Sequence, residues 1–127
     1  MDNFNTARKL TAEFLGTAFL LAAVVGSGIM AETLSPSNAG VALLANTAAT
    51  GAILMVLILI FGPISGAHFN PAVTLAYLIR RKISPGLAII YFVVQIVAAV
   101  AGAIIAHVMF EAPLLEASTH VRTGPAQ

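Results

Sequence analysis

The sequence predicts an all-α membrane protein with three transmembrane helices and one re-entrant half-helix. Three observations lead to this fold class. First, 59% of the 127 residues are hydrophobic and only 9% are charged, whereas a soluble domain of this length needs a charged surface. Second, three apolar stretches are long enough to cross a bilayer. Third, a polar loop follows the second stretch, and the helix expected after that loop is too short to cross.

The expected spans cover residues about 10–31, 41–62 and 85–110. The first is too long for the apolar core of a signal peptide, so we expect it to be retained as a helix. A turn rich in Ser, Pro, Asn and Gly at 32–40 separates it from the second span, and Ser84-Pro85 is a typical helix start for the third. We expect residues 111–127 to form an external tail, which makes 1–127 a single domain.

The re-entrant loop and its half-helix are expected over residues about 63–79. Asn70 is a favoured N-cap, and Pro71 suits the first helical position because its missing N–H costs nothing there. The basic cluster Arg80-Arg81-Lys82 ends this helix. The helix is then roughly 14 Å long, which is half of a roughly 30 Å hydrocarbon core. We expect the backbone from Pro63 to Phe69 to be non-helical. Such backbone is tolerated at membrane depth only inside protein or along a water-filled cavity.

The loop is therefore expected to line a pore. Because Gly66 and Ala67 have little side chain, the carbonyls of Gly66, Ala67 and His68 are expected to face the pore as acceptors. The Asn70 amide and the positive end of the half-helix would lie at the inner end of this row. The predicted pore-lining residues of the loop are Gly66, Ala67, His68, Asn70, Pro71 and Ala72.

Residues 65–74 read Ser-Gly-Ala-His-Phe-Asn-Pro-Ala-Val-Thr, and this run resembles the first-repeat signature of the aquaporin or major intrinsic protein family. The resemblance implies that the chain is one of the two inverted repeats of an aquaporin-like fold. It implies passive conduction of water or small uncharged solutes, such as glycerol or neutral metalloid acids, without a cofactor. No second Asn-Pro-Ala loop occurs in the chain, so we expect a second repeat, or an inverted copy of the chain, to complete the pore and a higher homo-oligomer to form.

Two polar residues within the apolar spans are expected to support the loop. A carboxylate at Glu13 is costly in a bilayer unless it finds donors inside the bundle. The resemblance implies that a glutamate in a Glu-x-x-Gly-Thr setting, here Glu13, Gly16 and Thr17, braces the backbone of the pore loops. Gln95, one turn after Tyr91, resembles the family pattern in which a glutamine supports the same loop.

The resemblance also implies a place for Thr50 in the pore wall. Counted back from Asn70 without gaps, Thr50 falls where the family commonly has an aromatic residue at its outer constriction. A threonine there leaves room for a solute larger than water, such as a polyol or an undissociated metalloid acid.

The positions of the basic residues predict the orientation. Five of the six lie on one side of the membrane if there are three spans and one re-entrant loop, namely Arg8, Lys9, Arg80, Arg81 and Lys82. The positive-inside rule then places the N-terminus in the cytoplasm and residues 111–127 outside, with the plasma (inner) membrane as the expected location. The same bias disfavours insertion of an inverted copy.

The residues exclude several other classes. There is no nucleophile–base pair and no phosphate-binding loop, so we expect no enzyme, and no His, Cys or carboxylate cluster has metal-ligand spacing. The expected partners are membrane lipid and a neutral solute, with no nucleic acid. Two other functions stay open: a non-conducting membrane fragment or assembly subunit, and a small dual-topology proton-coupled exporter that uses Glu13.

Overall fold

The computed structural model describes residues 4–114, and within them the chain forms four helices: α1 (Thr6–Leu34), α2 (Ala39–Ser65), α3 (Pro71–Ile79) and α4 (Pro85–Met109). The predicted fold class is confirmed, because the described chain is helical with no strand. The helices α1, α2 and α4 are long and apolar enough to cross a membrane. Of the expected external tail, residues 115–127 lie outside the described residues.

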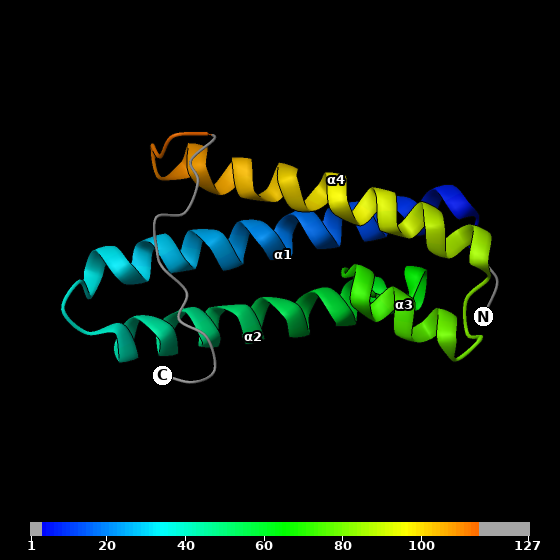
Figure 1. Ribbon diagram of the computed structural model, residues 1–127, viewed down its shortest axis with the longest axis horizontal. Coiled ribbons are helices and arrows are strands. Elements are labelled where there is room, and N and C mark those ends of the chain that lie inside the picture. The colour runs from blue at the N-terminus through cyan, green and yellow to red at the C-terminus, as the bar shows by residue number, and fades with distance from the viewer. Residues whose placement is uncertain (1–3, 115–127) are drawn as a thin grey trace.

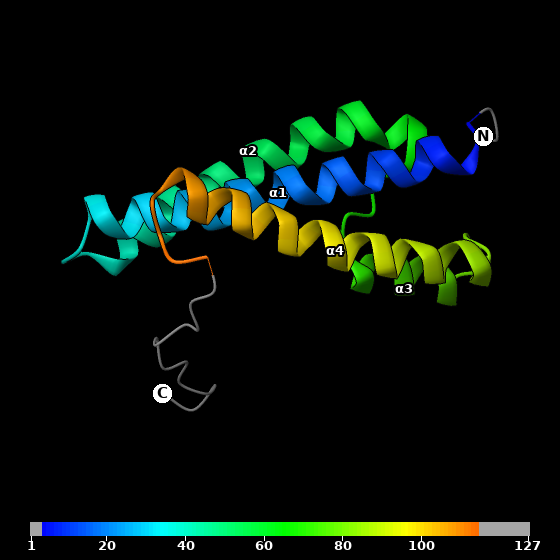
Figure 2. The ribbon, with the colours of Figure 1, turned by 90° about the horizontal axis from the view of Figure 1, so that it is seen from above.

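The helix α1 lies between the other two long helices. It packs against α2 on one side and against α4 on the other, while the short α3 packs on α4 (Figure 1). Seen from above, the chain leaves the end of α2, crosses α1 and reaches α3 on the side of α4 (Figure 2). The loop between α2 and α3 therefore passes over the first half of α1, and this crossing positions the site described below.

Each long helix begins at a polar cap. The cap side chains accept a hydrogen bond from a backbone N–H of the first turn, in the pairs Asn5 with Arg8, Asn38 with Val41, and Ser84 with Leu87. In α1, helical structure extends about one turn beyond the apolar stretch at its N-terminal end. Glu13 therefore lies two turns inside the helix.

The end of α2 differs from the prediction. We expected non-helical backbone from Pro63, but α2 continues to Ser65, with Pro63 inside its last turn. A proline removes only one helical hydrogen bond, and the loop contacts that replace helical bonds begin at Ser65. Backbone groups at membrane depth have no water to bond, so Pro63 and Ile64 keep the helical arrangement.

Small residues let α1 and α4 approach closely. A Cβ built on Gly102 would overlap the backbone oxygen of Ala18 and lie 3.0 Å from Cβ of Leu21. Ala98 and Ala106, one turn before and after, are fully buried. Small residues one turn apart on the same helix face permit such a close approach.

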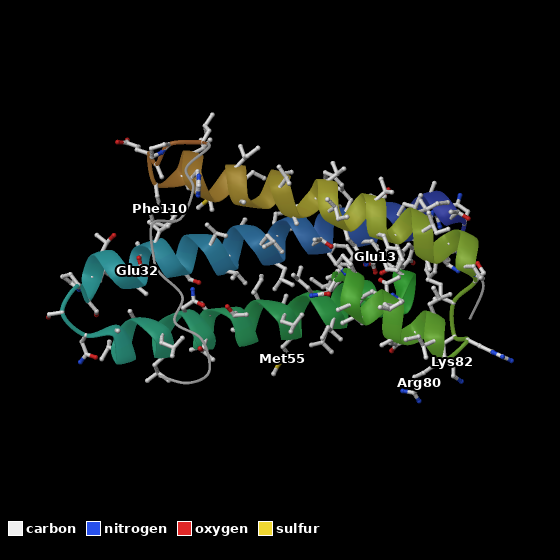
Figure 3. All side chains as sticks on the ribbon, in the orientation of Figure 1. Glu13, Glu32, Met55, Arg80, Lys82 and Phe110 are labelled. Atoms are coloured by element: carbon white, nitrogen blue, oxygen red, sulfur yellow. The ribbon has the colours of Figure 1, made fainter. Side chains whose placement is uncertain are left out.

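The outer surface of the helices is apolar. In α2 only Ala42 and Leu57 are buried, and Met55 points away from the other helices (Figure 3). Charged residues lie at the helix ends instead. Arg80 and Lys82 are at one end of the bundle, and Glu32 is at the other (Figure 3). The three long helices thus present apolar side chains over a length that matches a bilayer.

Candidate functional site

The loop that crosses α1 has an unusual backbone. Gly66 caps α2 in the left-handed region, with φ 93°, and its N–H donates to the carbonyl of Gly62 at 3.0 Å. Ala67 and Phe69 also have positive φ angles, of 51° and 52°. For a residue with a Cβ this conformation costs about 1–2 kcal/mol. Contacts from the surrounding helices must therefore hold the loop in this shape.

The strongest of these contacts come from Glu13 on α1, which is completely buried. Its Oε1 accepts the backbone N–H of His68 at 2.9 Å, and its Oε2 accepts that of Phe69 at 2.7 Å. The hydroxyl of Ser65 donates to Oε1 at 2.6 Å, and Nε2 of Gln95 donates to Oε2 at 2.9 Å. Each carboxylate oxygen therefore accepts two hydrogen bonds, which suits a buried anion.

These bonds determine where the loop carbonyls point. All peptide bonds in the described chain are trans, so the C=O of each peptide points opposite to its N–H. Because the N–H groups of His68 and Phe69 face Glu13, the carbonyls of Ala67 and His68 point away from α1. The N–H of Ala67 faces the Ser65 hydroxyl at 3.1 Å, so the carbonyl of Gly66 points away from Ser65. The loop thus turns its donors inward and its acceptors outward.

The ring of Phe69 anchors the loop by packing. A Cβ built on Gly16 of α1 would overlap this ring, so the ring occupies a notch that only glycine leaves open. Phe61 of α2 contacts it edge to face, with ring centroids 6.1 Å apart, and Phe69 is only 2% exposed. The role of Phe69 is not evident from its place in the sequence. The available signal was Gly16, three residues after Glu13 and therefore on the same face of α1.

Asn70 and Pro71 start α3 as the sequence predicts. The Asn70 Oδ1 accepts the N–H of Ala72 at 2.7 Å, and Pro71 occupies the first helical position. With Oδ1 used in this way, the side-chain nitrogen of Asn70 is left as a donor. Asn70, Pro71 and Ala72 are all exposed in this chain, on the open side of the loop.

Residues of α3 and α4 complete the support. Gln95 bridges Glu13 and the hydroxyl of Thr74, with both distances from Nε2 equal to 2.9 Å. The Tyr91 hydroxyl donates to the backbone oxygen of Ser65 at 2.9 Å. Thr74 and Ser65 were not among the predicted site residues. Their side chains are ordinary in the sequence, and only the crossing of the loop over α1 brings them to Glu13.

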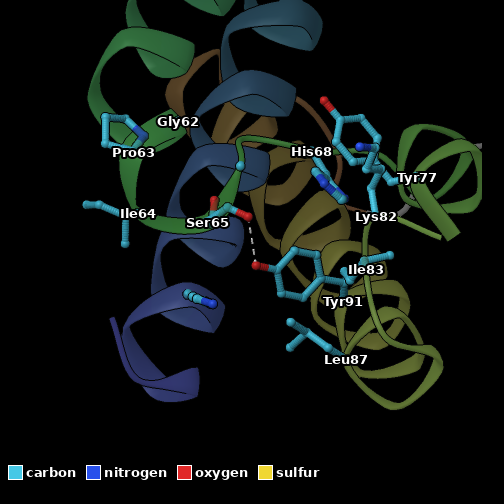
Figure 4. A pocket seen from close by; sticks show the side chains of 12 residues that line it. Gly62, Pro63, Ile64, Ser65, His68, Tyr77, Lys82, Ile83, Leu87 and Tyr91 are labelled. Atoms are coloured by element: carbon cyan, nitrogen blue, oxygen red, sulfur yellow. Dashed lines mark hydrogen bonds between the residues drawn. The ribbon is translucent and has the colours of Figure 1, made fainter. Parts of the chain in front are cut away.

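A cavity of about 400 Å³ opens beside the loop, on the side of the basic cluster (Figure 4). Gly66 and His68 line it from the loop, and Tyr77, Lys82 and Tyr91 line it from α3, the following turn and α4. The wall of the cavity combines aromatic rings, hydroxyl groups and the side chains of two lysines, Lys9 and Lys82. Such a lining suits a wet entrance better than a tight site for an apolar ligand.

Thr50 does not join this cluster. It lies fifteen residues before the end of α2, roughly 22 Å along the helix axis. Its hydroxyl oxygen is buried and has no hydrogen-bond partner among the described residues. The structure therefore brings together the loop, Glu13 and Gln95, and leaves Thr50 at a separate position along α2.

The site as a whole offers hydrogen-bonding groups but no reactive pair. Within residues 4–114, no three His, Asp or Glu side chains gather in a way that could hold a metal ion. Both oxygens of Glu13 are occupied by hydrogen bonds from the loop and Gln95. The ring of His68 contacts the Thr74 hydroxyl and not a carboxylate. The arrangement can orient a polar, uncharged molecule along a row of carbonyl oxygens.

All residues of this site lie within a region that is similar to known proteins. The family model described as "Major intrinsic protein" matches residues 1–126. Over 127 residues the chain is 52% identical to the aquaglyceroporin AqpS of Rhizobium meliloti (strain 1021), a match that covers all of this chain and 54% of that protein.

Two further relatives match over 101 residues, or 80% of this chain. The lens fiber major intrinsic protein of Lithobates pipiens is 39% identical, with 36% of its length covered. Aquaporin Z of Brucella melitensis biotype 1 is 36% identical, with 43% covered. The chain thus spans about half the length, or less, of these curated relatives.

Proposed function

We propose, since this chain belongs to the major intrinsic protein family, that it forms one half of a passive membrane channel for water or small uncharged solutes. One observation carries the proposal. The buried Glu13 carboxylate accepts hydrogen bonds from the N–H groups of His68 and Phe69, so that the carbonyls of the same two peptides point away from α1. A row of acceptors beside the exposed Asn70 amide is what a neutral, hydrogen-bonding solute needs.

Conduction follows from these groups. A solute such as water would donate to the carbonyls of Gly66, Ala67 and His68 and accept from the Asn70 side chain in turn. Cations would lose more hydration energy than a few carbonyl oxygens return. The positive end of α3 begins at Pro71, directly after Asn70, and it would repel a proton or a cation at the same point.

The relatives' names bear on the solute. The relative with 52% identity is named an aquaglyceroporin, and others are named aquaporins. Together with Thr50 at a position where the family commonly has an aromatic residue, this favours a solute of the size of glycerol or a neutral metalloid acid in addition to water. If Thr50 does line the wall, its side chain narrows the pore less than an aromatic ring would.

A complementary half is part of the proposal. The open side of the loop carries the polar groups of Asn70 and three carbonyls, and such groups cost several kcal/mol each when they face lipid. We propose that a second repeat, or an inverted copy of this chain, covers them, and that such units form a higher oligomer. The basic cluster supports an inner-membrane orientation with the N-terminus in the cytoplasm.

The exporter alternative receives no support from the site. A proton-carrying carboxylate has to exchange its partners during transport, whereas both oxygens of Glu13 are occupied, two of the four donors being backbone N–H groups. A flux measurement distinguishes the channel from the other alternative, a non-conducting membrane fragment or assembly subunit.

The test is stopped-flow swelling of vesicles that contain this chain together with a second-repeat chain. We expect water and glycerol permeability well above that of protein-free vesicles. Ala72→Phe should abolish the flux, because Ala72 is exposed on the open side of the loop. Met55→Phe is the matched control, since Met55 is exposed on the outer surface of α2. Vesicles with folded protein of both chains and no added permeability would contradict the proposal.

A further inference from the structure

The hydrogen bonds around Glu13 have a direction that can be followed outward from the backbone. The N–H groups of His68 and Phe69 can only donate, so both Glu13 oxygens are acceptors. Gln95 is next, with its side-chain amide against Oε2 of Glu13. If the amide were turned over, two oxygens would be in contact there. The NH₂ end of Gln95 must therefore face the carboxylate.

The orientation of Gln95 then sets the direction of the Thr74 hydroxyl. The NH₂ group has two hydrogens, one for Glu13 and one for Oγ1 of Thr74, each over 2.9 Å. Thr74 thus accepts from Gln95 and has its own hydrogen left to donate. The nearest acceptor is Nδ1 of His68 at 3.0 Å. The other candidate, Oε1 of Gln95, is 3.3 Å away and belongs to the amide that already donates to this hydroxyl.

We infer that His68 is held as a single neutral tautomer, with Nδ1 accepting from Thr74 and the hydrogen on Nε2. The ring is kept in place by Tyr77 and Tyr91, whose centroids lie 4.3 Å and 5.4 Å from it. The Nε2 edge lies beside Gly66, where a Cβ would be 3.4 Å from it, and His68 lines the cavity of Figure 4.

This Nε2 atom is open to the cavity. Within residues 4–114, the buried side-chain polar atoms that lack a partner are the hydroxyl oxygens of Thr17 and Thr50, and Nε2 of His68 is not among them. Among the described residues, the His68 ring makes its one hydrogen bond through Nδ1 and none through Nε2. The hydrogen on Nε2 therefore points to the space that a solute would enter.

The consequence rests on the proposed function. Asn70 uses its oxygen on Ala72 and His68 uses its free lone pair on Thr74, so both polar side chains of the loop offer the solute a donor. A donor at Nε2 orients the oxygen of a passing water toward the protein. It has no lone pair with which to take a proton from a chain of waters or to bind a cation. Thr74 and Gln95 are thus positioning residues, which act on the permeant through His68.

The tautomer is measured directly by nitrogen NMR of protein labelled with ¹⁵N-histidine in lipid vesicles at neutral pH. The His68 signals are those lost in His68→Asn. We expect Nδ1 to give the signal of a nitrogen without hydrogen and Nε2 that of a nitrogen with hydrogen. A hydrogen on Nδ1, or on both nitrogens, of His68 in the unmodified chain would overturn the inference.

Variants then test the role of Thr74. Thr74→Val should convert the His68 signals to a mixture of tautomers, and Thr74→Ser, which keeps the hydroxyl, should restore the single form. Thr17→Val is the matched control, because it removes a buried hydroxyl that has no partner and should leave the His68 signals unchanged. Unaltered His68 signals in Thr74→Val would contradict the assignment.

Transport is measured on the same vesicles. With the complementary half present, Thr74→Val should admit protons faster than Thr74→Ser at similar water permeability, as read from an internal pH dye. Equal proton entry in the two variants would overturn the role in proton exclusion. Absence of water flux in the unmodified protein would instead contradict the channel proposal, while the tautomer would still be read by NMR.

Discussion

The ring of Phe69 fills the space beside Gly16 that the Cβ of any other residue would need. Gly16 and Glu13 lie three residues apart on one face of α1, and both hold the same stretch of loop. Gly16 does so by packing against Phe69, and Glu13 does so by hydrogen bonds to the backbone. A loop with two non-glycine residues at positive φ needs such support from both sides.

Gly16→Ala should destabilise the fold. The added methyl group overlaps the Phe69 ring, which is buried and contacts Phe61 of α2 on another side. We expect a loss of about 1–3 kcal/mol in the free energy of unfolding, measured by denaturant titration in detergent micelles. Gly51→Ala is the control, because nothing lies within 4 Å of its Cβ position, and a stable Gly16→Ala with an unstable Gly51→Ala would refute the packing argument.

Glu13→Leu should be more damaging than Glu13→Gln. The leucine leaves the N–H groups of His68 and Phe69 without partners, and these backbone groups cannot turn away as the Ser65 hydroxyl can. The expected cost is roughly 2–6 kcal/mol for the pair, while glutamine retains one oxygen and should lose roughly half as much.

Folded yield and thermal unfolding in detergent measure this order of stability. Glu32→Gln, a change at an exposed glutamate of the same helix, is the control and should be neutral. If Glu13→Gln removed transport at full folded yield, and flux followed a proton gradient, Glu13 would be a proton carrier and not a support of the loop.

Gly102→Ala should separate α1 from α4. The methyl group would overlap the backbone oxygen of Ala18, and backbone cannot rotate away as a side chain can. The helices must therefore move apart, which weakens the packing of the whole interface. We expect a lower melting temperature than for Gly86→Ala, a change in the same helix at a position with open space around it. Equal melting temperatures would mean that the close approach does not contribute to stability.

The basic cluster predicts one orientation in the membrane. Thr6→Cys and Ser37→Cys place single thiols at opposite ends of α1, because the 127 residues contain no cysteine of their own. A membrane-impermeant reagent added outside intact cells should label Ser37→Cys and leave Thr6→Cys unlabelled until the membrane is opened. Equal labelling of both from outside, with full water flux from this chain alone, would indicate a dual-topology half-channel.

The sequence by itself determined the helices of this protein. Long apolar stretches, the cap at Ser84, and the pair Asn70-Pro71 before a basic cluster are local features, and helix starts and span lengths depend on local features. The end of α2 was the exception. Pro63 locally favours the end of a helix. At membrane depth, however, no water is available to the backbone groups that would be freed, so the helix continues to Ser65.

The sequence also determined that Glu13 needs donors, because a buried carboxylate without them is too costly. Which donors it has was decided only by the tertiary structure. The backbone groups of His68 and Phe69 lie more than fifty residues further along the chain, and they meet Glu13 because the loop crosses α1. For Thr50, whose place in the pore wall stays a prediction, no described residue supplies a hydrogen-bond partner.

Phe69 and Thr74 illustrate the same limit. A phenylalanine in a loop and a threonine in a short helix are common, and nothing near them in the sequence marks one as the filler of a glycine notch and the other as the hydrogen-bond donor of a histidine. Both roles depend on contacts between segments that are distant in the sequence. Hydrophobic patterns and caps report which segments form helices, whereas the positions of individual atoms in the loop follow from how those helices pack.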